Sequence, residues 1–156
     1  MKAKLLYLFL PLLILSGCKK ENFETRPKLE LKDFRVFQVT TQSGSGTLIE
    51  VEFTAADKEG DVKDSIFIDK IDAATIPCSP NSLKGLKYRI PDFPGNRQRS
   101  LFRLQFSVNV QIDGYVLLNG PQCPGRADTS VFRFWVKDRA GNISDTLVTP
   151  SAFIPR

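Results

Sequence analysis

The run LFRLQFSVNVQI at residues 101–112 constrains the fold more than any other part of the sequence. Apolar side chains occupy every second position from Phe102 to Ile112, and polar side chains such as Arg103 and Asn109 lie between them. Because successive side chains of a β-strand point to opposite faces, this period of two predicts a strand with one buried face.

The same alternation recurs in shorter form at residues 49–55 and 132–136, and no segment has a sustained helical period. Weaker patterns mark further strand candidates at Leu29–Thr40, Ser65–Ala73, Leu86–Ile90 and Thr146–Thr149. Turn-forming residues separate them: SGSG at 43–46, KEGD at 58–61, PGN at 94–96, DG at 113–114 and AGN at 140–142. About seven short strands with such turns predict an all-β antiparallel sandwich. A tight hairpin at Asp113-Gly114 could add a strand over Tyr115–Leu118.

Two segments resemble a known kind of domain. AADKEGDVKDSIFI at 55–68 and FWVKDRAGNISDTLVTP at 134–150 are similar to the B–C turn and the F–G hairpin of bacterial immunoglobulin-like domains. The resemblance implies an immunoglobulin-like β-sandwich over residues 29–156, in which strands C and F are neighbours.

The N-terminus has the three parts of a secretory signal peptide: Lys2 and Lys4, an apolar run over Leu5–Leu15, and small residues before Cys18. The apolar run is shorter than the roughly 20 residues that a transmembrane helix needs. Leu15-Ser16-Gly17-Cys18 resembles the lipobox of bacterial lipoproteins, although an ordinary signal peptide with an incidental cysteine is the alternative.

With the lipobox, the chain resembles the small immunoglobulin-like lipoproteins of Bacteroidota. The resemblance implies a signal peptide at 1–17, lipid on Cys18, a charged tether at 18–28, and anchoring to a membrane without spanning it. Lys20-Glu21 loosely resembles the export signal of surface lipoproteins in that group, so an outer-membrane lipoprotein is expected, with surface exposure favoured over a periplasmic-facing location.

Charge and composition narrow the classes of function. Without Lys2 and Lys4 the chain has 20 basic and 17 acidic residues, a net charge of +3, which does not favour nucleic acid as a partner. The sequence has no histidine, the commonest general base, and it lacks the motifs of hydrolases and nucleotide-binding enzymes. We therefore expect a protein without catalytic activity.

Cys78 and Cys123 are the remaining cysteines, and export to an oxidising compartment favours a disulfide between them. If Ser65–Ala73 is strand C and residues 101–112 form strand E, both cysteines follow strands that run toward the same end of the sandwich. A disulfide would then join two loops at that end.

The acidic residues of the B–C turn raise the question of calcium. Asp57, Glu59 and Asp61 alternate, and Asp138 of the F–G turn lies at the same end of the predicted sandwich. Calcium needs several oxygen ligands at once, but the spacing departs from the EF-hand loop. Acids and glycine are also ordinary turn formers, so no cofactor is expected and calcium is kept as an alternative.

A binding surface is predicted on the outer face of the sheet that contains strands C and F. The alternation that buries Phe132, Phe134 and Val136 turns Trp135 outward. Its expected neighbours on that face are Arg133, Phe67 and Ile71. Contiguous exposed apolar surface usually marks a partner or ligand, unless the connection from Ala74 to Ser100 covers it.

That connection is itself a second candidate, because it is basic and contains aromatic residues, among them Lys87, Tyr88 and Arg89. A loop of this kind suits an anionic glycan, a lipid headgroup or an acidic protein. The sequence thus predicts a membrane-anchored, non-catalytic binding or adhesion domain for an unknown protein or glycan. The alternatives are a structural or assembly subunit of a cell-envelope complex and a calcium-stabilised glycan-binding module.

Overall fold

The structure is a computed structural model that describes residues 24–42, 44–62, 64–72, 83–90, 97–120 and 127–155. Within these ranges the chain forms nine strands, and no helix there is long and apolar enough to cross a membrane. The strands are β1 (Lys28–Thr41), β2 (Gly44–Ala56), β3 (Ser65–Asp72), β4 (Leu83–Arg89), β5 (Arg99–Val108), β6 (Val116–Leu118), β7 (Asp128–Lys137), β8 (Leu147–Val148) and β9 (Ala152–Ile154).

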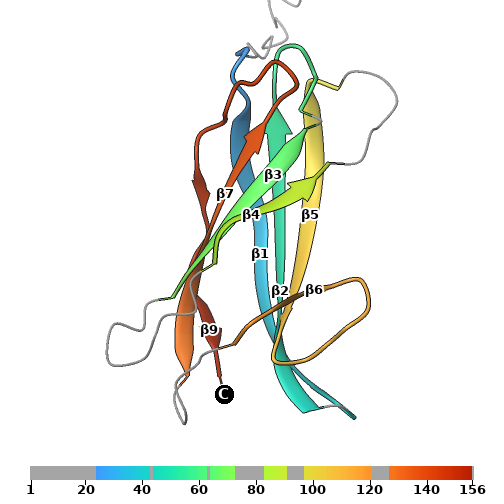
Figure 1. Cartoon of the computed structure of the whole chain (residues 1–156), viewed down its shortest axis with the longest axis vertical. Helices are drawn as coiled ribbons and strands as arrows, with labels where there is room; N and C mark the ends of the chain where they lie inside the picture. The colour runs from blue at the N-terminus through green and yellow to red at the C-terminus, as the bar shows by residue number, and fades with distance from the viewer. Residues whose placement is uncertain are drawn as a thin grey trace, which may run out of the picture.

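The strands form two sheets that pack against each other, which confirms the predicted β-sandwich. One sheet has the order β1-β2-β5-β6, and the other has the order β4-β3-β7-β8 with β9 also paired to β7. Figure 1 shows β3, β4 and β7 crossing in front of β1, β2 and β5. β2 lies between β1 and β5 in one sheet, and β7 lies between β3 and β8 in the other.

The core lies between the two inner faces, as the alternating pattern predicts. Ile49, Val51 and Phe53 of β2 are fully buried, as are Phe132 and Phe134 of β7. The rings of Phe106 and Phe132 stack with their centroids 5.5 Å apart, and neighbouring aromatic pairs extend this stack across both sheets. Those pairs are Phe53–Phe102, Phe53–Phe134, Phe106–Phe134 and Phe132–Phe134.

The segment Tyr115–Leu118 does contain an added strand, β6, but this strand does not form the antiparallel hairpin that Asp113-Gly114 could have made. β5 ends at Val108, four residues before the predicted end, and Asn109 has a positive φ of 65° that turns the chain away. The following loop brings β6 back alongside β5 in a parallel pair, whereas all other strand pairs among the described residues are antiparallel. β9 has three residues, too few for an alternating pattern to reveal it.

The structure also differs from the turn predicted at residues 43–46, because β1 and β2 remain paired as far as Thr41 and Gly44. Gly46 therefore lies inside β2 and not in a turn. A Cβ atom at this position would lie 2.4 Å from the carbonyl oxygen of Val108, so the glycine permits a close approach of β2 to the end of β5.

Thr149 and Ser144 pair with β7 through both their backbone and their hydroxyl groups, beside the short strand β8. Thr149 donates its N–H to the Phe132 carbonyl (3.0 Å), and its Oγ1 accepts the Phe132 N–H (3.1 Å). Ser144 makes the same pair of bonds with Val136, at 3.0 Å and 2.9 Å. The side-chain oxygens take the place of strand carbonyls, so β7 keeps its hydrogen bonds although β8 has only two residues.

Candidate binding face and acidic cluster

The first candidate site is the outer face of the sheet β4-β3-β7-β8, called here the outer aromatic face and defined by Lys87, Phe67, Trp135, Ile143 and Val148. Phe67 and Trp135 are paired across β3 and β7. Their rings are stacked, with centroids 5.5 Å apart and planes 5° apart. The Lys87 ammonium lies 5.7 Å from the centroid of the Phe67 ring, which is the geometry of a cation–π contact. These contacts form one row across three strands.

The period of two explains this arrangement. Ile66 and Ile68 of β3 and Phe134 and Val136 of β7 are buried in the core, so the residues between them point to the opposite side. The structure places Arg133 and Ile71 on this outer face too, where Arg133 pairs with Asp69 and Ile71 pairs with Val131.

Ile143 and Val148 belong to the same face and were missed in the sequence. They are 52% and 51% exposed. Ile143 bridges to Lys137, and Val148 pairs with Arg133, so both extend the face beyond Trp135. Ile143 follows the turn motif AGN at 140–142, where no alternating pattern indicates which way a side chain points. A shallow hollow of about 330 Å³ lies beside Trp135, lined by Asp69, Arg133, Trp135, Ile143 and Thr146.

The basic connection is not one loop, because residues 83–89 form β4 at the edge of the sheet. This part extends the outer aromatic face and does not cover it; residues 73–82 and 91–96 lie outside the described ranges. Lys87 and Arg89 are exposed, whereas Tyr88 is only partly exposed. Tyr88 pairs with Ile66 and packs against the core, and burial raises the pKa of its hydroxyl.

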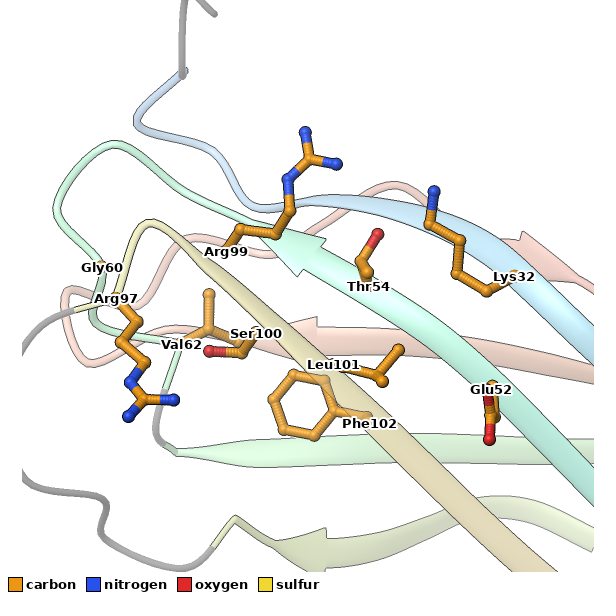
Figure 2. A pocket seen from close by; sticks show the side chains of 10 residues that line it. All are labelled: Lys32, Glu52, Thr54, Gly60, Val62, Arg97, Arg99, Ser100, Leu101 and Phe102. Carbon is orange, nitrogen blue, oxygen red and sulfur yellow. The ribbon is translucent and has the colours of Figure 1, made fainter.

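Arg97 and Arg99, at the other end of the connection, lie next to the other sheet. They border a hollow of about 700 Å³ near the start of β5. Figure 2 shows their side chains pointing away from one another, so they do not converge on one anionic group. The hollow is lined by Lys32, Glu52, Thr54, Gly60, Val62, Arg97, Arg99, Ser100, Leu101 and Phe102.

The second candidate site is a cluster of three carboxylates, Asp57, Asp61 and Asp138. Asp57 follows β2 and is 0% exposed, and Asp138 follows β7 and is 2% exposed. One carboxylate oxygen from each of the three residues lies within 4.8 Å of the others. Figure 1 shows β2 and β7 ending at the same end of the sandwich, where β1 begins. The two turns that resemble an immunoglobulin-like domain therefore meet here.

Hydrogen bonds hold these carboxylates in place but leave two oxygens without a partner. Asp57 Oδ2 accepts the Asp61 N–H at 3.1 Å. Asp138 accepts the backbone N–H and the side-chain amide of Asn142, at 2.7 Å and 2.8 Å. Asp57 Oδ1 and Asp61 Oδ1 are buried and have no hydrogen-bond partner among the residues that the structure describes.

The cluster changes the acidity of its own members. Burial raises the pKa of Asp61 from its usual 3.8 to about 6. The neighbouring carboxylates of Asp57 and Asp138 act in the same direction. Glu59, the fourth calcium candidate of the sequence, has an exposed side chain and does not belong to the cluster.

Comparison with family models, with curated proteins and with solved structures gave no match.

The cysteine predictions concern residues outside the described ranges: Cys18, Cys78 and Cys123. Cys123 follows β6 and not β5, but β6 runs parallel to β5 and so leads toward the same end. In Figure 1 this is also the end toward which β3, the strand before Cys78, runs. The disulfide stays a prediction, as does lipidation of Cys18.

Proposed function

We propose that this chain is a membrane-anchored lipoprotein whose immunoglobulin-like domain binds a protein partner, without catalysis, through the outer aromatic face. The observation that carries the proposal is the stack of Phe67 on Trp135, with Lys87 against it, on the solvent side of the sheet. An aromatic row of this kind is not needed to hold the sandwich together, because the core lies on the other side of the sheet.

The chemistry of the face suits a protein more than a small molecule. Ile143 and Val148 extend the apolar row beyond Trp135. Arg133 of β7 lies on the same face, opposite Val148 of β8. Tryptophan and arginine are enriched among the residues that contribute most to protein–protein binding. The hollow beside Trp135 is shallow, whereas small-molecule sites are usually deeper and more enclosed. A glycan that stacks on Trp135 is the alternative ligand.

The anchor is proposed from the lipobox alone. Leu15-Ser16-Gly17-Cys18 would direct lipid to Cys18, and two or more acyl chains give stable attachment to a membrane. The domain would then be displayed at the outer membrane, with the cell surface favoured over the periplasmic side. In this location the partner would be another envelope protein or a protein outside the cell.

The proposal can be tested by substituting Trp135 with alanine in the full-length chain. The parent chain, the Trp135→Ala variant and a Leu101→Ala control are expressed with an affinity tag in the native envelope and extracted in mild detergent. Leu101 suits the control because it is 61% exposed and belongs to β5 of the other sheet. Bound proteins are then identified and quantified by mass spectrometry.

We expect one protein that is recovered with the parent and the control but is depleted at least about tenfold with Trp135→Ala, the effect of a binding hot spot. A partner retained equally by all three chains would exclude the outer aromatic face. A partner that remains stoichiometric through extended washing would indicate a structural subunit of an envelope complex. Loss of binding to a glycan panel in Trp135→Ala, with no protein captured, would favour the glycan-binding alternative.

A further inference from the structure

The acidic cluster contains buried oxygens that the fold itself does not satisfy. Asp57 is completely buried and contributes a carboxylate oxygen to the cluster with Asp61 and Asp138, and among the described residues its Oδ1 has no hydrogen-bond partner. Asp61 Oδ1 is in the same condition. Burying a carboxylate oxygen is strongly unfavourable unless a donor or a cation compensates for the lost water. The arrangement is therefore incomplete without a further positive group.

We propose that Asp57, Asp61 and Asp138 bind a calcium ion at this end of the sandwich. Calcium binds oxygen ligands at about 2.4 Å, so two oxygens on one ion can be at most about 4.8 Å apart. The three carboxylates meet this limit, since one oxygen from each lies within 4.8 Å of the others. Among the described residues no hydrogen bond occupies Oδ1 of Asp57 or of Asp61, so both atoms are available as ligands.

The donor set favours calcium over other cations. Zinc prefers histidine nitrogen and cysteine sulfur, and the sequence has no histidine. Magnesium demands a near-ideal octahedron and keeps several waters, which does not suit three carboxylates from two separate loops, two of them buried. Calcium accepts six to eight oxygens in irregular geometry, so backbone carbonyls and water can complete its shell.

The position of the cluster gives the ion a structural role. Asp57 follows β2 of one sheet and Asp138 follows β7 of the other, so a shared ion would link the two sheets. The first described residues lie against the same loops: the Glu24 carbonyl accepts the Lys58 N–H at 2.9 Å, and Arg26 Nε donates to the Ile143 carbonyl at 2.6 Å. Calcium would therefore strengthen the end at which the chain enters the domain. This inference does not depend on the proposed protein partner.

The test uses the full-length chain in detergent, stripped with a chelator and titrated with calcium chloride in a calorimeter and in thermal melts. Three chains are compared: the parent, Asp57→Asn, and Glu59→Gln as the matched control. Glu59 belongs to the same loop, but its side chain is exposed and outside the cluster. Asp61→Asn replaces Asp57→Asn should that variant fail to fold.

We expect saturable calcium binding by the parent and by Glu59→Gln, with a rise in melting temperature of about 5 °C or more at an excess of calcium. Asp57→Asn should bind at least about tenfold more weakly. It should also melt higher than the parent when both are free of metal, because the amide removes a negative charge and can donate to Asp61. Absence of a calcium-dependent heat and melting shift in the parent, or an equal response of Asp57→Asn, would overturn the assignment. Preference for magnesium over calcium would overturn it as well.

Discussion

Replacing Tyr115 with phenylalanine should weaken the fold, because it removes a hydroxyl that donates to Glu50 and accepts from Gln105. The Tyr115 hydroxyl donates to Glu50 Oε1 at 2.7 Å, and it brings the loop after β5 back over β2. A hydrogen bond to a charged group contributes about 1.5–3 kcal/mol. Glu50 keeps its bonds to Gln105 (3.0 Å) and Arg35 (2.9 Å) in the variant, so the lower half of this range applies. We expect the free energy of unfolding at pH 7 to fall by about 1.5–2 kcal/mol.

The pH dependence identifies the bond. The Tyr115 hydroxyl, and then the Gln105 amide, lower the pKa of Glu50 below its ordinary value of 4.5. A carboxyl whose pKa is lower in the folded state stabilises the fold above its unfolded pKa, and this contribution is lost as the pH falls through the folded pKa. The bond to Glu50 also raises the pKa of Tyr115, so this stabilisation is lost again as the pH rises through that higher value.

Urea unfolding followed by the fluorescence of Trp135, the only tryptophan, gives the free energies at pH 7 and pH 3. The difference between the parent and Tyr115→Phe should be largest at pH 7 and shrink at pH 3. Tyr88→Phe is the matched control, because the Tyr88 side chain packs against the core and is not part of the Glu50 network; it should change stability by less than about 0.5 kcal/mol. A loss below about 0.5 kcal/mol in Tyr115→Phe at pH 7, or an equal loss at both pH values, would refute the reasoning.

Three further predictions concern the core, a close approach and the anchor. Phe106→Ala should lower the free energy of unfolding by about 3–5 kcal/mol in urea titrations, because the buried ring lies in the stack between the sheets; a loss under about 1 kcal/mol would contradict this. Gly46→Ala should lower the free energy of unfolding by about 1–3 kcal/mol, because the added Cβ would clash with the Val108 carbonyl oxygen. An unchanged melting temperature would contradict the close approach of β2 to the end of β5. Intact mass of the membrane fraction should show acyl chains on Cys18; an unmodified N-terminal peptide would disprove lipidation.

The strand pattern of the sequence predicted the sandwich because one rule, alternation, governs each long strand independently. Phe106 and Val108 of β5 and Phe132 and Phe134 of β7 lie in the core, as the period of two requires. The outward direction of Trp135 followed from the same rule. These features depend on local pattern and burial, which a single sequence displays.

The features that could not be predicted depend on contacts between distant residues. The parallel pairing of β6 follows a loop that one hydrogen bond from Tyr115 to Glu50 holds over β2, and no local signal distinguishes it from a hairpin. Ile143 joins the outer aromatic face only through its bridge to Lys137. Tyr88 is a different case: its alternation with Leu86 and Ile90 did indicate burial, but the basic composition of the segment obscured it.

The acidic cluster was predicted in part. The sequence placed Asp57, Asp61 and Asp138 at one end of the sandwich, since the B–C and F–G turns meet there in an immunoglobulin-like fold. It could not show that Asp57 is completely buried or that its Oδ1 lacks a partner among the described residues. Glu59 has the same spacing as its neighbours but points to solvent, because loop side chains follow no fixed period.

The most direct test of the central claim, that the outer aromatic face is a protein-binding surface, is photo-crosslinking in living cells. A photoreactive amino acid replaces Ile143 on this face or, as the control, Leu101 on the opposite sheet; the two side chains are 52% and 61% exposed. We predict one discrete adduct with a second protein from position 143, lost when Trp135→Ala is added, and no such adduct from position 101. The same adduct from both positions, or one from position 101 alone, would contradict the claim.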